Sequence, residues 1–285
     1  MAIDKKLAVR CEHQQPNLGE AALDMAALYR HIVGRNRFLP IPKDEERFVG
    51  DGDFRAIGAE FLELFIRYGG LRPEWDVLDF GCGIGRMALP LTQYLDPTAR
   101  YVGVDVNRRG IQWCKRRISR VYENFAFHFI DYENALYNPG GKKKPWDTEI
   151  PFEKGSFDFI FATSVFTHLN RQEAKAFISQ LAGLLRPGGR FFATFFLIDE
   201  MAVRSMQEGR SRLVFRIQSG MNSTEAEALP SGSAVAFNKS WIEVILAGNG
   251  LQMLGEPLRG TWPGLTEGGT YQDLVVAEKP GLDRR

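Results

Sequence analysis

Residues 77–86 of the chain read VLDFGCGIGR, and this stretch decides the fold. An apolar pair leads into the acidic Asp79, three glycines then alternate with other residues, and a helical pattern follows from Met87 to Tyr94. Glycine adopts turn conformations that other residues avoid, and it lets the backbone approach a ligand closely. The stretch therefore predicts a strand, a ligand-binding turn and a helix, in that order.

The residues beside the turn restrict the ligand. A dinucleotide-binding GxGxxG motif requires glycine at position 86, where this chain has Arg86. The carboxylate of Asp79 would repel a pyrophosphate and attract an ammonium group. The pattern therefore disfavours nicotinamide dinucleotides, which stay the alternative cofactor for such a turn.

The rest of the chain alternates between two periodicities. Apolar residues from Phe54 to Tyr68 recur at helical spacing and stop at Gly69-Gly70, and residues 18–33 form a second amphipathic candidate. After residue 70, short β-rich runs alternate with helical stretches, which predicts an α/β fold with a mostly parallel sheet and helices on both faces. The seven predicted strands are residues 76–80, 101–104, 125–130, 157–162, 190–197, 251–254 and 272–277.

One predicted helix has clear ends, and two segments interrupt the alternation. Asn170 and Glu173 have the spacing of a capping box, and the RPGG sequence at residues 186–189 ends the helix that they begin. Residues 137–150 carry glycines and a run of three lysines, while residues 199–236 are rich in Met, Ser, Gly and Arg. Insertions of this kind form substrate loops or lids, or decorate the surface.

A second acidic residue ends the next predicted strand. Residues 101–107 read YVGVDVN. A carboxylate at the position of Asp105 can accept hydrogen bonds from both hydroxyls of a ribose. The alternative role is a helix cap, because either Asp105 or Asn107 can begin the helix that follows.

Five motifs in order resemble those of class I S-adenosylmethionine-dependent methyltransferases. They are DFGCGIG at 79–85, GVDV at 103–106, IDY at 130–132, IPFEKGSFD at 150–158 and LRPGG at 185–189. The resemblance covers residues 77–197 and implies a Rossmann-like sheet of seven strands, the last one antiparallel. It also implies S-adenosylmethionine as cofactor.

The same resemblance implies a role for each matching residue. The turn at residues 81–85 would hold the methionine part, Asp105 the ribose and Asp131 the adenine amino group. Tyr132 would lie against the adenine ring, and the strand end at residues 162–164 would face the ammonium group. The predicted cofactor-binding residues are Asp79, Gly81, Cys82, Gly83, Gly85, Asp105, Val106, Asp131, Tyr132, Thr163 and Ser164.

His168 is the candidate catalytic residue. It follows the fourth predicted strand, at the end of the sheet where open α/β folds bind their ligands. Methyl transfer is an in-line displacement, and a general base accelerates it when the acceptor must lose a proton. Imidazole titrates near neutral pH and suits that role. The alternative is a histidine that only orders the loop.

Composition favours a small-molecule acceptor. With 36 basic and 35 acidic residues the formal charge is +1, so no overall field attracts nucleic acid. The strand end at 162–165 reads ATSV rather than the Asn/Asp-Pro-Pro-aromatic tetrad of enzymes that methylate bases. Three scattered cysteines, Cys11, Cys82 and Cys114, predict neither disulfides nor a metal site. The N-terminus has no signal peptide and no apolar run is long enough to span a membrane, so we expect a cytoplasmic protein.

These patterns predict four parts and one activity. Residues 1–70 would form a helical cap, 71–198 the cofactor-binding core, 199–236 a lid-like insert, and 237–285 the last part of the core. We predict methyl transfer to an oxygen, or a nitrogen, of a small molecule or glycan-type metabolite. The alternatives are an NAD(P)-dependent oxidoreductase and a non-catalytic S-adenosylmethionine-binding protein. Trp262 is predicted either to close over the acceptor or to pack under the sheet.

Overall fold

The computed structural model describes residues 18–281, apart from residues 49, 51, 135, 148, 217–222, 228, 231, 267 and 269, and it describes side chains from residue 25 onward. Residues 1–17 of the predicted cap, with Cys11, and part of the predicted insert therefore lie outside the described residues. None of the described helices combines the length and apolar character that a bilayer crossing requires.

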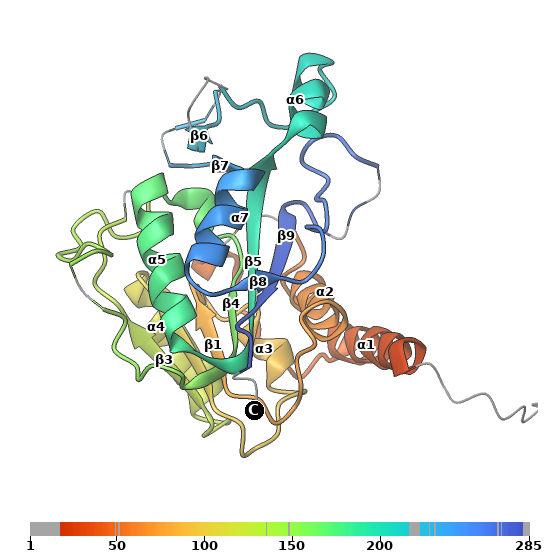
Figure 1. Cartoon of the computed structure of the whole chain (residues 1–285). Helices are drawn as coiled ribbons and strands as arrows, with labels where there is room; N and C mark the ends of the chain where they lie inside the picture. Colours follow the sequence, from red (N-terminus) through yellow and green to blue (C-terminus); the bar gives the residue numbers. More distant parts are fainter. Residues whose placement is uncertain are drawn as a thin grey trace, which may run out of the picture.

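Within the described residues, a mixed sheet of nine strands forms the centre of the protein (Figure 1). β1 pairs in parallel with β2 and β4, β2 with β3, and β4 with β5. On the other edge of β5, the antiparallel β9 follows, and β8 pairs with β9. The strands are Val77–Phe80 (β1), Tyr101–Asp105 (β2), Phe125–Phe129 (β3), Phe157–Ala162 (β4), Leu185–Ile198 (β5), Ser223–Glu225 (β6), Val235–Asn238 (β7), Gln252–Met253 (β8) and Asp273–Glu278 (β9).

The predicted fold class is confirmed, and the predicted count of seven strands is two too low. Each predicted strand coincides with a strand of the structure, and the last one is antiparallel as expected. The additional strands are β6 and β7, which pair with each other, and β7 pairs with Phe196–Ile198 at the end of β5. β6 and the first residues of β7 lie within residues 199–236, which the sequence predicts as an insert outside the strand–helix alternation, so neither strand was recognised.

Helices cover both faces of the sheet (Figure 1). The Asp53 side chain caps one of them by accepting hydrogen bonds from the amides of Arg55 and Ala56, and Asn170 and Glu173 form the predicted capping box of another. The helices are Leu18–Arg35 (α1), Phe54–Arg67 (α2), Ala88–Leu91 (α3), Arg108–Cys114 (α4), Arg171–Leu184 (α5), Glu200–Gln207 (α6) and Lys239–Gly248 (α7), with shorter helical turns at Asp44–Glu46 (η1), Lys115–Ser119 (η2) and Phe166–His168 (η3).

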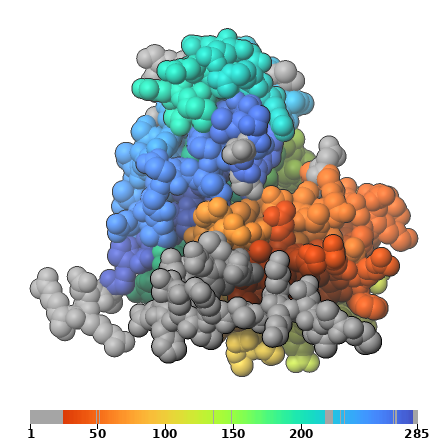
Figure 2. Space-filling model, turned by 90° about the vertical axis from the view of Figure 1, so that its right-hand side faces the viewer, coloured from red at the N-terminus to blue at the C-terminus, as the bar shows by residue number. Residues whose placement is uncertain are grey.

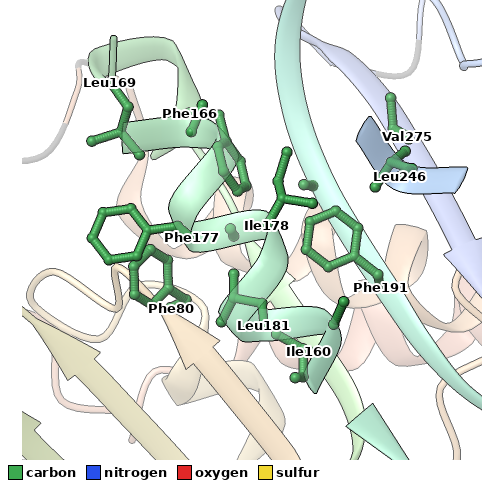
Figure 3. Close-up of a cluster of buried hydrophobic side chains, with 14 of the residues drawn as sticks. Phe80, Ile160, Phe166, Leu169, Phe177, Ile178, Leu181, Phe191, Leu246 and Val275 are labelled. Atoms are coloured by element: carbon green, nitrogen blue, oxygen red, sulfur yellow. The ribbon is translucent and has the colours of Figure 1, made fainter. Parts of the chain in front are cut away.

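One layer of the core lies between the sheet and helices α5 and α7. Figure 3 shows Phe177 and Ile178 of α5 beside Phe80 of β1 and Phe191 of β5. The rings of Phe80 and Phe177 are 4.7 Å apart. This layer packs near the carboxyl ends of β1 and β4. Helix α5 begins directly after the segment that follows β4, so the layer also positions that segment.

The second layer lies between the other face and helices α1 to α4. At its centre the fully buried Phe65 of α2 contacts three rings of the sheet. Its ring centroid lies 5.7 Å from Phe159, 4.4 Å from Phe161 and 4.8 Å from Phe192. Burial of these aromatic surfaces fixes α2 against β4 and β5.

We predict that Phe65→Ala lowers the free energy of unfolding by about 3–5 kcal/mol, because it removes a ring from a packed core and leaves a cavity. Urea unfolding of the full chain measures the change. Tyr68→Ala serves as the control, since Tyr68 is 42% exposed at the end of the same helix. Equal losses in the two variants would contradict this account of how α2 is held.

Candidate functional site

A cavity of about 810 Å³ lies at the carboxyl ends of the central strands. This is where open α/β sheets bind their ligands. The turn after β1, the end of β2, the residues after β3 and the segment after β4 form one part of its wall. Helix α2 and residues of the 261–272 segment, which precedes β9, form the other part. In Figure 2 the orange and red surface of α1 and α2 adjoins the blue C-terminal surface, with the teal α6 segment above.

The glycines of the turn have distinct reasons to be glycine. Gly81 has a φ of +85°, and a Cβ there would lie 2.2 Å from Cγ2 of Val165. Gly83, with a φ of +55°, lies on the cavity wall beside Gly81 and Cys82. Gly85 does not line the cavity: it has a φ of +80°, and its missing side chain makes room for Cys114 of α4. Gly85 therefore shapes the turn from behind.

Asp105 ties the turn to the second strand. Its Oδ2 accepts a hydrogen bond of 2.7 Å from the amide of Gly83, and its Oδ1 accepts one of 2.6 Å from the amide of Asn107. Burial raises the pKa of Asp105 to about 6, although these amides oppose the shift. Its oxygens keep further lone pairs, and Asp105 and Val106 line the cavity. Asn107, rather than Asp105, caps α4 by accepting from the amide of Gly110.

Asp79 does not line the cavity, contrary to its predicted place among the ligand-binding residues. Its side chain is fully buried, and its Oδ2 accepts a hydrogen bond of 2.5 Å from the Tyr101 hydroxyl. Burial raises the pKa of Asp79 well above its ordinary value, which favours the neutral acid. Side chains alternate along a strand, so Asp79 points to the same face as Val77, into the layer of α1 to α4.

Asp131 and Tyr132, which follow the third strand, point to different sides: only Tyr132 lines the cavity. Tyr132 lines the cavity with Ile130, and its ring meets that of Phe177 edge-on at 5.2 Å. Asp131 does not line the cavity, because its Oδ1 accepts a hydrogen bond of 3.2 Å from Asn138 in the loop that follows. Of the two residues predicted to contact adenine, only Tyr132 therefore lines the cavity.

The segment after β4 brings three predicted residues to the cavity: Thr163, Ser164 and His168. Nδ1 of His168 lies 3.1 Å from the carbonyl oxygen of Gly232, between β6 and β7. A carbonyl only accepts, so Nδ1 donates and Nε2 is left as an acceptor. Burial lowers the pKa of His168, which keeps the ring neutral at neutral pH. The ring of Tyr137 meets the imidazole edge-on at 5.9 Å.

Several wall residues were not predicted. On α2 they are Ile57, Glu60 and Phe61. Ile57 and Phe61 belong to the apolar stripe of the predicted helix and look like core positions in the sequence, and the charged Glu60 lies outside that stripe. From the 261–272 segment, Thr261 and Tyr271 join them. The other unpredicted wall residues are Phe48, Gly50, Phe80, Arg86, Met87, Ile130, Glu133, Asn134, Tyr137, Val165, Leu169, Glu173, Phe177, Gly268, Thr270 and Gln272.

Trp262 packs beneath this segment and does not close over the cavity. It is fully buried, its Nε1 donates a hydrogen bond of 2.7 Å to Asp273, and its ring lies 5.6 Å from that of Phe196 and 5.4 Å from that of Phe215. Of its two predicted placements, the structure has the packed one. Within the described residues, no group of three or more His, Cys, Asp or Glu side chains is arranged to hold a metal ion.

Comparison with known proteins identifies the core. Residues 77–189 match the family described as a methyltransferase domain. Over these residues the chain is similar to class I S-adenosylmethionine-dependent methyltransferases. Phthiotriol/phenolphthiotriol dimycocerosates methyltransferase 1 of Mycobacterium ulcerans is 34% identical over 41% of this chain and 36% of that protein. Fatty-acid O-methyltransferase of Mycolicibacterium smegmatis is 31% identical over 41% of this chain and 36% of that protein. The chain thus spans about a third of the length of the curated relatives that it matches.

Solved structures share the fold of this chain. The PH0226 protein of Pyrococcus horikoshii OT3 has a TM-score of 0.54 at 17% identity, over 84% of this chain and 99% of that one. Magnesium protoporphyrin IX methyltransferase of Synechocystis PCC 6803, solved with bound SAH, has a TM-score of 0.50 at 20% identity, over 81% of this chain and 90% of that one. At these identities the likeness concerns the fold.

We predict that Gly81→Ala weakens S-adenosylhomocysteine binding by about tenfold or more, because the new Cβ must displace Val165 from the cavity wall. Isothermal titration calorimetry measures the affinity. Gly188→Ala is the matched control, since Gly188 has a similar φ of +82° but nothing within 4 Å of an added Cβ. If both variants bind as tightly as the unaltered protein, the close approach at Gly81 has no role in binding.

Proposed function

We propose that the protein is an S-adenosylmethionine-dependent methyltransferase that methylates an oxygen, or a nitrogen, of a small molecule with an apolar body. The observation that carries the proposal is the shared cavity. The residues that fit a nucleoside lie at the strand ends, and the walls from α2 and residues 261–272 leave the same cavity room for a second molecule.

The strand-end residues fit the cofactor. The lone pairs of Asp105 that face the cavity suit the two ribose hydroxyls. Tyr132 and Ile130 supply an apolar wall for the adenine ring, while the side-chain-free wall at Gly81 and Gly83 lets the methionine part approach the backbone. When bound, the cofactor supplies a methyl group on a positively charged sulfur.

The acceptor wall fits an apolar molecule with one polar group. Ile57 and Phe61 of α2 and Met87 present apolar surface, and Glu60 lies between them. Two relatives carry names that point the same way, since one is a fatty-acid O-methyltransferase and the other acts on phthiotriol and phenolphthiotriol dimycocerosates. We infer an oxygen as the first candidate for the methylated atom.

His168 is the residue that we propose as general base. Nδ1 is committed to the carbonyl of Gly232, so the unprotonated Nε2 is available to take the proton that an acceptor hydroxyl loses. The remaining residues act by alignment: the wall fixes the acceptor opposite the methyl group and excludes water from the line of displacement. Once it has taken up the proton, the His168 ring is a cation, and it returns to the neutral form by releasing that proton to solvent.

We expect His168→Asn to lower kcat by about 10²–10⁴-fold, because an amide nitrogen can donate to the Gly232 carbonyl in the same way but cannot accept a proton. Transfer of a labelled methyl group from S-adenosylmethionine to an extracted or synthetic acceptor provides the rate. For the unaltered protein the rate should rise with pH through the lowered pKa of His168 and then level off. A variant that retains full kcat would exclude His168 as the base.

Cofactor affinity should depend on the charge of Asp105. Because burial raises its pKa to about 6, the carboxylate becomes protonated as the pH falls through about 6, and one of its lone pairs is lost to the ribose. The affinity for S-adenosylhomocysteine should therefore decrease below pH 6 and stay constant above pH 7. Asp105→Asn should bind weakly at every pH. Calorimetric titrations at several pH values measure this, and a profile that is flat for the unaltered protein would contradict the role of Asp105.

A further inference from the structure

Ser164 has a backbone conformation that its side chain disfavours. Its φ is +57°, and it is the only non-glycine residue with a left-handed φ in the part of the chain that the structure describes. This conformation is costly for a residue with a Cβ and persists only where the surroundings hold it. Ser164 lies directly after β4, on the wall of the cavity.

A ring of three hydrogen bonds surrounds this residue. The Ser164 amide donates to Oγ1 of Thr194 over 2.8 Å, the Thr194 hydroxyl donates to Oε1 of Gln272 over 2.6 Å, and Nε2 of Gln272 donates to the Ser164 hydroxyl over 2.7 Å. Nε2 also lies 3.5 Å from the hydroxyl oxygen of Thr167. The segment after β4, strand β5 and the residue directly before β9 are thereby joined at one point.

The Ser164 backbone N–H determines which atom donates and which accepts in each hydrogen bond of this ring. The backbone N–H of Ser164 can only donate, so Thr194 accepts there and directs its own proton elsewhere. That proton meets the oxygen of the Gln272 amide, which places the nitrogen of the amide toward Ser164. Thr194 is fully buried, so the ring has no water to replace a lost partner from that side.

The neighbour of Ser164 connects this ring to the glycine turn. Val165 follows Ser164, and its Cγ2 occupies the space where a side chain at Gly81 would lie. A change of φ at Ser164 would therefore move the side chain that packs directly against the turn. Interiors are close-packed, so such a movement is transmitted and not absorbed.

We propose that Gln272 is a positioning residue. It holds Ser164 in the left-handed conformation and so fixes Val165 over the turn at Gly81 and Gly83. Gln272 acts through Ser164 on the cofactor-binding turn, and it lies directly before β9, next to Tyr271 on the acceptor wall. The inference rests on the proposed function, because its consequence is the affinity of that turn for the cofactor.

The test compares S-adenosylhomocysteine affinities of full-length variants by calorimetry. Gln272→Ala should weaken binding by about tenfold, equivalent to about 1.4 kcal/mol. Ser164→Ala and Ser164→Gly both remove the hydroxyl, but only glycine adopts the left-handed conformation without cost, so the alanine variant should bind about tenfold more weakly than the glycine variant. In the Ser164→Gly background, Gln272→Ala should add less than about a twofold loss. Gln252→Ala, an exposed glutamine on the neighbouring β8, is the control and should not change the affinity.

Three results would overturn the proposal. Equal losses in Ser164→Ala and Ser164→Gly would mean that the hydroxyl itself contacts the ligand. An undiminished effect of Gln272→Ala in the glycine background would mean that Gln272 acts independently of Ser164. If Gln272→Ala lowers the free energy of unfolding in urea but leaves the affinity for S-adenosylhomocysteine unchanged, Gln272 has a role in folding alone. If the unaltered protein does not bind S-adenosylhomocysteine, both the proposed function and this inference fail. If it binds, but Ser164→Ala and Ser164→Gly lose the same affinity, only this inference fails.

Discussion

The hydrogen bond from the Gly83 amide to the Asp105 carboxylate is the interaction on which the site depends. It joins the turn after the first strand to the end of the second, so the groups proposed to hold the methionine part and the ribose share one contact. The bond is buried, and a buried carboxylate left without its donors would be costly. The turn therefore cannot move without Asp105, and the two parts of the proposed cofactor site form one unit.

The remainder of the structure positions other elements around that unit. Val165 fills the space beside Gly81, the α5 layer supports the segment after β4, and the aromatic layer around Phe65 holds α2 against the sheet. On the far side, the buried Asp273 accepts hydrogen bonds from Trp262, Gly260 and Leu197, which fixes the segment that completes the acceptor wall. The walls of the cavity are thus held in place by three separate sets of contacts: the α5 layer, the layer around Phe65 and the hydrogen bonds to Asp273.

The sequence predicted the fold and the half of the site formed by strand ends. Glycines with positive φ and acids after strands are local features, so Gly81, Gly83 and Asp105 could be assigned from their own neighbourhoods, whereas Tyr132 was assigned from the family resemblance alone. The prediction for Asp79 was wrong in place, because the pattern does not reveal that its side chain turns to Tyr101. Asp131 and Gly85 also lie off the cavity wall for reasons of tertiary packing.

The acceptor half could not be predicted, because it exists only in the folded protein. Phe61 and Glu60 lie on a helix whose spacing indicates burial, and nothing local shows that this face meets the segment containing Tyr271. The ring of hydrogen bonds through Gln272 likewise joins residues that are far apart in the sequence. The strands β6 and β7 were missed because they begin within the segment predicted as an insert, and Gly232, which contacts His168, lies between them.

A crystal structure of the protein with bound S-adenosylhomocysteine would show whether the strand-end residues hold the cofactor. We expect the ligand in the 810 Å³ cavity, with both ribose hydroxyls on Asp105, the adenine beside Tyr132 and the sulfur near the turn at Gly81 and Gly83, facing the wall of α2. A ligand bound elsewhere, or in this cavity with its ribose away from Asp105, would contradict it.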